Sequence, residues 1–259
     1  MGTTIDYVYA VGRVEARFPS PAAEKEFTRV TGQEDITDPA DPQLLKSVLS
    51  QRENRYLAPQ LCWILAIEGL ETYILVPRDP ADLHRLVEAA GRTGSAQDLD
   101  VVIGVRGPIA PPGICSGLTL PVVRFDHIFP FDRDTLTRSI PKPGKMSAED
   151  YAPVAENLYM TIMQMADNVG ATDEHRALNY CAVRYPAIYT LVGEASGRNA
   201  ALTALEVRPS RLDSTRKIME VILTFTDRQT GMADHYFVSV DVTEMFPFLV
   251  TKLAPYTGR

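Results

Sequence analysis

The second half of the chain separates helices from strands, and this order constrains the fold more than any other feature of the sequence. Apolar residues recur at intervals of three or four from Tyr151 to Val169, which predicts an amphipathic helix. Two more helices are expected, one between the N-cap Thr172 and Pro186 and one from Ile188 to Gly197. Strands then follow over 201–208, 217–226 and 235–242, the last two joined by a hairpin loop. Consecutive helices followed by consecutive strands predict an α+β fold with a helical cluster in the second half.

The first half mixes short helices with strands. A β-rich run over 5–18 loses its alternation at Gly12, which predicts a bulge or bend there. The other expected elements are helices over 21–30, 44–53, 79–90 and 132–140, a hairpin of buried strands over 61–67 and 72–76, and strands over 99–105 and 118–128. Hairpins without regular βαβ alternation predict antiparallel-rich mixed sheets with flanking helices.

The 259 residues are expected to form a single domain, 1–259. A Pro- and Gly-rich run over 141–145 suits neither a helix nor a sheet interior. If the domain divides, the subdomains would therefore be 1–140 and 147–259.

The composition limits which kinds of partner the chain is expected to bind and which compartment it is expected to occupy. The chain has 26 Lys and Arg against 33 Asp and Glu, and a net charge of −7 disfavours nonspecific binding to nucleic acid or anionic membranes. The N-terminus lacks the features of a signal peptide, and apolar runs fall short of a membrane span. The cysteines Cys62, Cys115 and Cys181 are odd in number and far apart, which argues against a disulfide framework and favours the cytoplasm.

Motifs for cofactors and metals are absent from the sequence. It contains neither a phosphate-binding loop nor a dinucleotide fingerprint, so no cofactor is expected. The four histidines are scattered without the spacing of metal ligands, so no metal is expected.

Two groups of residues are weak candidates for catalysis. His175, with Asp173 and Glu174 before it and Asn179 one turn later, could perform acid–base chemistry, although the acids also suit the first turn of a helix. Cys115 lies in the Pro- and Gly-rich loop 107–117 and is expected to be the most exposed cysteine, either as a nucleophile or as an ordinary loop residue.

Two arginine-bearing segments could form a rim that binds peptides. Guanidinium groups bind carboxylates and peptide carbonyls well, whereas solvated surface charge is the simpler explanation of any one of these residues. The candidates are Arg52, Arg55, Arg208 and Arg211.

Several segments, in the same order along nearly the whole chain, resemble one family. They are Tyr7–Phe18, Leu49–Tyr56, Gln60–Trp63, Glu68–Tyr73, Asp100–Pro111, Gly170–Tyr180 and Phe246–Leu253. Together they resemble the C-terminal domain of unknown function of PatG-type cyanobactin maturation proteases, also found in the PatA-type partner. In that family the subtilisin-like activity resides in a separate domain, so no residue of this sequence inherits its catalytic triad.

The resemblance implies a role in the maturation of ribosomal peptides. The leading expectation is a non-catalytic accessory module that binds the precursor peptide or maturation enzymes such as a protease or cyclodehydratase. One alternative is an enzyme that modifies the same peptides through His175 or Cys115. Another is a structural module that forms homo-oligomers.

Overall fold

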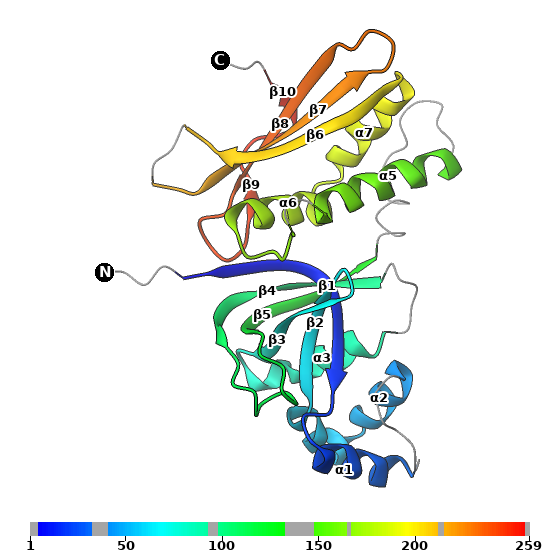
Figure 1. Cartoon of the computed structure of the whole chain (residues 1–259), viewed down its shortest axis with the longest axis vertical. Helices are drawn as coiled ribbons and strands as arrows, with labels where there is room; N and C mark the ends of the chain where they lie inside the picture. The colour runs from blue at the N-terminus through cyan, green and yellow to red at the C-terminus, as the bar shows by residue number, and fades with distance from the viewer. Residues whose placement is uncertain are drawn as a thin grey trace. The chain divides into compact units, whose positions relative to one another are not determined.

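The computed structural model describes residues 5–32, 41–92, 98–132, 148–164, 167–211 and 215–256. The expected linker over 141–145 and nearly all of the expected helix over 132–140 lie outside these ranges. The chain divides into two compact units, Met1–Phe131 and Asp132–Arg259, and each combines helices with mostly antiparallel strands (Figure 1). The α+β class expected from the sequence is confirmed.

The first unit is built around a closed five-stranded barrel. Its strands follow the order β1-β2-β3-β5-β4, with β1 antiparallel to both β2 and β4 and with β3 parallel to β5. The strands are β1 (Tyr7–Arg17), β2 (Cys62–Ile67), β3 (Leu70–Pro77), β4 (Asp98–Ile109) and β5 (Pro121–Asp132). This order, with a helix between β3 and β4, is the topology of the OB-fold.

Strand β1 closes the barrel because it changes partners along its length. Its first half, 7–12, pairs with β4, and its second half, 13–17, pairs with β2, while the strand curves strongly (Figure 1). Gly12 lies at the change of partner, and a Cβ atom there would come within 2.4 Å of the Ala66 carbonyl oxygen. The break in alternation at Gly12 therefore marks a close approach of two backbones, which glycine alone permits.

Two groups of helices connect the barrel strands. Between β1 and β2 lie α1 (Pro21–Thr31), α2 (Pro42–Leu49) and the 3-10 helix η1 (Arg52–Gln60); between β3 and β4 lie η2 (Pro80–Asp82) and α3 (Leu83–Ala90). The side chains of Ser20, Asp41 and Asp79 accept hydrogen bonds from the first turns of α1, α2 and η2.

The expectation of one helix over 44–53 is wrong. Helix α2 ends at Leu49, and η1 begins at Arg52, because Gln51 takes an extended backbone conformation. The Gln51 carbonyl then accepts from the Asn54 amide at 3.1 Å, and the Gln51 side chain accepts from Asn54 Nδ2 at 3.0 Å. The segment therefore forms two short helices rather than one.

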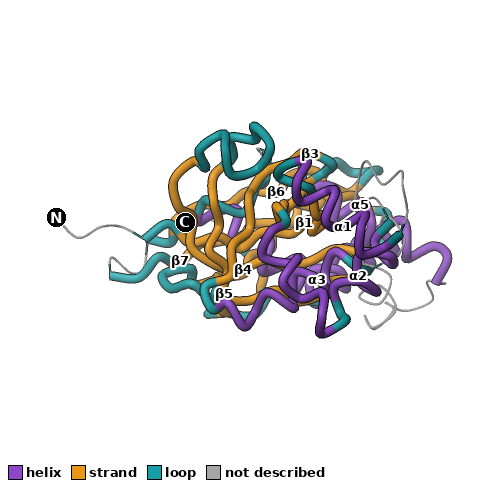
Figure 2. The backbone as a smooth tube through the Cα atoms, turned by 90° about the horizontal axis from the view of Figure 1, so that it is seen from below, coloured by secondary structure: helices purple, strands orange, loops and turns teal. Residues whose placement is uncertain are grey.

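The second unit is an antiparallel sheet with helices on one face (Figure 1). Figure 2 shows the backbone of the chain from below, coloured by secondary structure. The strand order is β10-β8-β7-β6, and β9 pairs with β8. The helices are α5 (Ala148–Met163), α6 (Asp173–Arg184) and α7 (Ala187–Gly197), and the strands are β6 (Ala200–Pro209), β7 (Ile218–Asp227), β8 (Ala233–Asp241), β9 (Phe248–Leu249) and β10 (Ala254–Pro255). Helices α6 and α7 pack on the sheet, and α5 packs on both of them.

Helix α5 ends earlier than its apolar pattern predicts. The pattern extends to Val169, whereas the helix ends at Met163. The cause is Asn168, whose Nδ2 donates to the Ile162 carbonyl at 3.2 Å and whose Oδ1 accepts from the Gly170 amide at 3.2 Å. These bonds satisfy backbone groups outside a helix and close its end. None of the helices within the described ranges is long and apolar enough to cross a membrane.

Candidate functional site

The first unit contains a cavity of about 510 Å³ between the end of α2, η1 and the start of α3. Its lining combines apolar side chains with a guanidinium, an imidazole and a carboxylate. The lining residues are Leu49, Ser50, Arg55, Ala58, Pro80, Ala81, Leu83, His84, Val87 and Glu88. Ligand pockets span roughly 300–1,000 Å³, so this cavity is the candidate binding site.

One wall of the cavity is η1, which the barrel holds in place. Asn54 and Leu57 are buried on the inner side of η1, while Arg55 stays exposed on the cavity side. The indole of Trp63 in β2 donates to the Ala58 carbonyl at 3.0 Å, a buried hydrogen bond. Contacts of the residues before and after Arg55 thus hold the backbone of η1 in place.

The opposite wall is formed by η2 and α3. Asp79 Oδ1 accepts from the Ala81 amide at 2.8 Å, which starts the short helix. His84 Nδ1 donates to the Ala81 carbonyl at 2.7 Å, because a carbonyl can only accept. With the proton on Nδ1, Nε2 is the nitrogen of an uncharged imidazole that can accept a hydrogen bond. Glu88 follows His84 by four residues and lies on the same side of α3.

These walls combine a cation, hydrogen-bond acceptors and apolar surface. The Arg55 guanidinium can donate two parallel hydrogen bonds to a carboxylate. Glu88 and His84 Nε2 can accept backbone N–H groups, and Leu49, Leu83 and Val87 offer apolar contact. The arrangement provides recognition of charge, backbone and apolar surface within one cavity.

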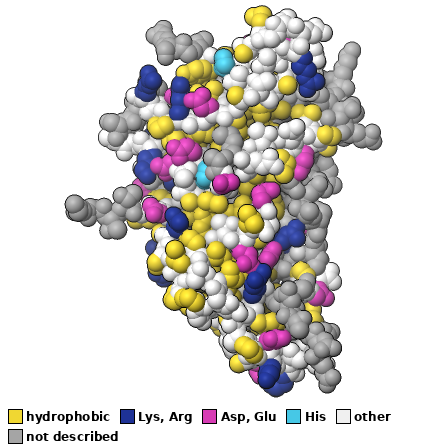
Figure 3. Space-filling model, in the orientation of Figure 1, with side chains coloured by type: hydrophobic (Ala, Val, Ile, Leu, Met, Phe, Trp, Pro, Cys, Tyr) yellow, Lys and Arg dark blue, Asp and Glu magenta, His cyan; other side chains and the backbone are white. Residues whose placement is uncertain are grey.

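The four arginines expected to bind peptide are divided between the two units, with Arg52 and Arg55 in the first and Arg208 and Arg211 in the second. Arg55 lines the cavity, and Arg52 is exposed on the same helix without lining it. In the second unit Arg208 pairs with Glu220 at 3.2 Å and stacks on the Tyr256 ring at 5.1 Å, while Arg211 is exposed after β6. On the face drawn in Figure 3, basic and acidic side chains are interspersed.

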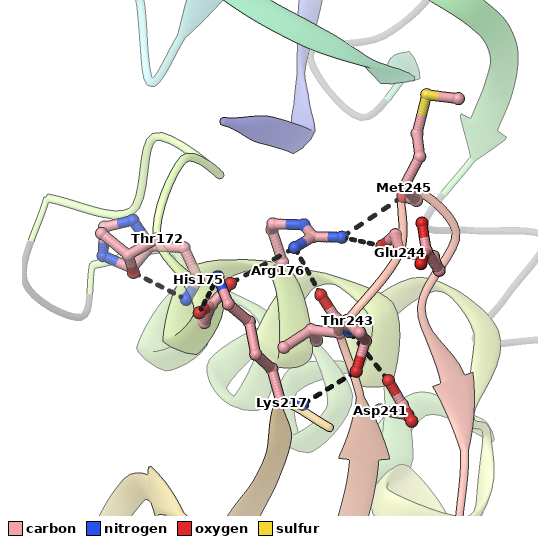
Figure 4. Close-up of polar contacts among 10 residues, drawn as sticks. Thr172, His175, Arg176, Lys217, Asp241, Thr243, Glu244 and Met245 are labelled. Carbon is pink, nitrogen blue, oxygen red and sulfur yellow. Dashed lines mark hydrogen bonds and ion pairs between the residues drawn. The ribbon is translucent and has the colours of Figure 1, made fainter. Parts of the chain in front are cut away.

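The acid–base candidates lie at the start of α6 in the second unit (Figure 4). Thr172 caps this helix by accepting from the His175 amide at 3.1 Å, as the sequence predicts. Asp173 makes ion pairs with Lys217 at 3.0 Å and Arg176 at 3.3 Å, and Glu174 is half-buried. The Asp173 carboxylate therefore joins α6 to Lys217, the residue before β7.

His175 and Asn179 share the buried side of α6. His175 is 8% exposed and Asn179 is fully buried. Asn179 Oδ1 accepts from Asn168 Nδ2 at 2.7 Å, so its amide belongs to the polar contact that closes the end of α5. Within the described residues, no group of three or more His, Cys, Asp or Glu side chains could hold a metal ion.

Arg176, which was not among the residues predicted from the sequence, joins α6 to the segment after β8. Its side chain is 2% exposed and donates to the carbonyls of Val242 at 2.7 Å, Glu244 and Met245 at 3.4 Å (Figure 4). Only the spacing from Asp173 was visible in the sequence, because the carbonyl partners lie more than 60 residues downstream. The contacts identify Arg176 as a structural clamp.

The expectation that Cys115 is an exposed thiol is wrong. Cys115 is fully buried and forms a disulfide with Cys62, with 5.5 Å between their Cα atoms. The inference against disulfides failed because 53 residues separate the partners, whereas the barrel brings β2 beside the β4–β5 loop. In the oxidised state Cys115 has no thiolate to attack a substrate.

Together, an OB-type barrel and a helix-backed antiparallel sheet define a two-unit α+β protein whose candidate binding site lies in the barrel unit. Residues 145–256, within the second unit, match the family model described as PatG C-terminal. A solved structure of a PatG domain of unknown function shares the fold, with a TM-score of 0.77 and 22% identity over 97% of this chain and 98% of that one. No curated protein matches the chain. The resemblance indicated by the sequence is confirmed.

Proposed function

We propose that this chain is a non-catalytic accessory module of ribosomal-peptide maturation of the cyanobactin kind, and that it binds the precursor peptide in the cavity of the barrel unit. One observation carries the proposal: Arg55, a residue expected to contact peptide, lines a cavity of about 510 Å³ beside His84 and Glu88. The PatG likeness of the second unit provides the biochemical context.

The peptide would bind through an acidic residue flanked by apolar ones. Its carboxylate would accept hydrogen bonds from the Arg55 guanidinium, and its apolar side chains would contact Leu49, Leu83 and Val87. Hydrogen bonds to a charged group contribute about 1.5–3 kcal/mol, so the loss of Arg55 would weaken binding by roughly tenfold to a hundredfold.

The experiment measures fluorescence anisotropy of the labelled precursor peptide encoded with this chain. Arg55→Gln is expected to raise the Kd at least about tenfold. Arg52→Gln is the matched control, because Arg52 is exposed on the same helix and does not line the cavity. The control is expected to bind as the wild type does.

Three outcomes would contradict the proposal. Equal affinities of the two variants would remove the cavity as the binding site. Capture of a maturation enzyme without any affinity for the precursor would make the chain an enzyme-docking module instead. A change in the intact mass of the precursor that requires this chain would make it an enzyme.

A further inference from the structure

The disulfide between Cys62 and Cys115 fastens a loop over one face of the barrel. Cys62 is the first residue of β2, and Cys115 lies in the middle of the loop 110–120 that joins β4 to β5. Both side chains are buried, at 4% and 0% exposure. The cross-link therefore joins the loop to the outer surface of the sheet.

The covered surface is apolar. Cys62 and Ile64 alternate along β2 with Trp63 and Leu65, which face the barrel interior opposite Ala16 and Val14. Ile64 pairs with Ile74 of β3 on the outer side, and the loop covers both. The cluster comprises Cys62, Ile64, Ile74, Ala110 and Cys115, with Leu118, Leu120 and Val122 packed against it.

This surface is the one that OB-folds use to bind ligands. Strands β2 and β3, with the β1–β2 and β4–β5 loops, form the ligand face in many proteins of this fold. Here the β4–β5 loop covers that face, so it is buried in the oxidised molecule.

Apart from the disulfide, the loop has few anchors to β2. Its backbone hydrogen bonds are internal, from Ile114 to Pro111, from Gly117 to Pro112 and from Leu118 to Cys115. The residues on either side of Cys115 are exposed, and Ile114 is 54% exposed. Burial of Cys115 and of Ala110 at the start of the loop, with partial burial of Leu118 and Leu120, supplies the remaining contact.

We propose that Cys62–Cys115 is a redox site whose reductant is a dithiol, and that its reduction releases the loop and uncovers the outer face of β2 and β3. A thiolate of the dithiol attacks one sulfur, and its second thiol then resolves the mixed disulfide. The reductant becomes a disulfide, and two electrons and two protons pass to Cys62 and Cys115 as two thiols.

The third cysteine does not compete in this exchange. Cys181 is fully buried in α6, and burial raises the pKa of its thiol to about 12. Thiolates are the reacting species, so the protonated Cys181 stays unreactive near neutral pH. Exchange with the dithiol is therefore confined to the pair of Cys62 and Cys115.

The first measurement is alkylation of the denatured, unreduced full-length chain followed by intact mass. One alkyl group, on Cys181, is expected, and a reducing agent should raise this number to three. Three alkyl groups without reduction would show that the disulfide does not form, and this would overturn the proposal.

The second measurement is hydrogen exchange of the native chain with and without dithiothreitol. The amides of Ile114, Gly117 and Leu118 should exchange about thirtyfold faster or more after reduction, the factor that corresponds to the lower end of a cross-link's typical effect. The amides of Val221 and Leu223 in β7 are the internal control and should keep their rates.

Matched variants distinguish the effect of losing the cross-link from any other effect of dithiothreitol. Oxidised Cys115→Ser should reproduce the fast loop exchange, whereas Thr119→Ser, an exposed change in the same loop, should exchange as the wild type does. Unchanged loop exchange after reduction would overturn the proposal. Faster exchange throughout the chain would also overturn it, because the disulfide would then support the whole fold.

Discussion

Arg176 shows how one side chain can hold a helix and a distant segment together. It lies in α6 and contacts the segment after β8. Its guanidinium satisfies three carbonyl groups of the segment 242–245, and it does so at 2% exposure. Buried carbonyl groups without partners are costly, so this arginine is more important for the fold than the exposed arginines.

We expect Arg176→Ala to lower the free energy of unfolding by about 3 kcal/mol, because the three carbonyls and Asp173 lose a charged donor. Denaturant unfolding followed by circular dichroism measures the change. Arg198→Ala is the control: Arg198 is exposed, and its replacement should shift the stability by less than about 0.5 kcal/mol. Equal stabilities of the two variants would contradict the structural role of Arg176.

At the scale of the element, two glycines of β4 differ in how closely the backbone of β5 approaches them. A Cβ atom on Gly104 would lie 2.3 Å from the Arg124 carbonyl oxygen and 2.6 Å from the Phe125 Cα atom, whereas a Cβ atom on Gly107 would meet the Val122 carbonyl oxygen at 3.4 Å. We expect Gly104→Ala to destabilise the protein by about 1–3 kcal/mol through this clash with β5. Gly107→Ala should be nearly neutral. Thermal melts of both variants test the pair, and a Gly104 variant as stable as the Gly107 variant would refute the close approach.

Local signals in the sequence predicted most elements of this fold. Thr172 caps α6, Asp79 starts η2, and the hairpin of β2 and β3 follows its apolar runs. The errors arose at the ends of helices, where a single residue interrupts the helical backbone. Asn168 ends α5 before its apolar pattern does, and the extended backbone of Gln51 divides α2 from η1.

The candidate site was less predictable, because its residues come from segments that are far apart in the sequence. Arg55 was identified by its chemistry, whereas its cavity partners His84 and Glu88 come from α3, about 30 residues downstream. The disulfide depends on closure of the barrel, which no local pattern encodes. Long-range contacts, rather than propensities, determine which of the candidate residues meet.

At the scale of the whole molecule, each unit has its own core and its own sheet. The second unit includes the full PatG-like segment, with β6, β7 and β8 backed by α5, α6 and α7. A unit with its own core can fold alone. We therefore expect residues 133–259, expressed alone, to unfold cooperatively and to show mixed helix and strand signals in circular dichroism. A fragment without a cooperative transition would show that its core needs the barrel unit.

The hydrogen bond between Trp63 and Ala58 makes the tryptophan an intrinsic fluorescent probe of the cavity. Trp63 is the single tryptophan of the chain, and its indole donates to a carbonyl of a residue that lines the cavity. Indole emission depends on the polarity and hydrogen bonding around the ring. Occupancy of the cavity can thus be followed through the intrinsic fluorescence of the unlabelled protein, with no other indole contributing to the signal.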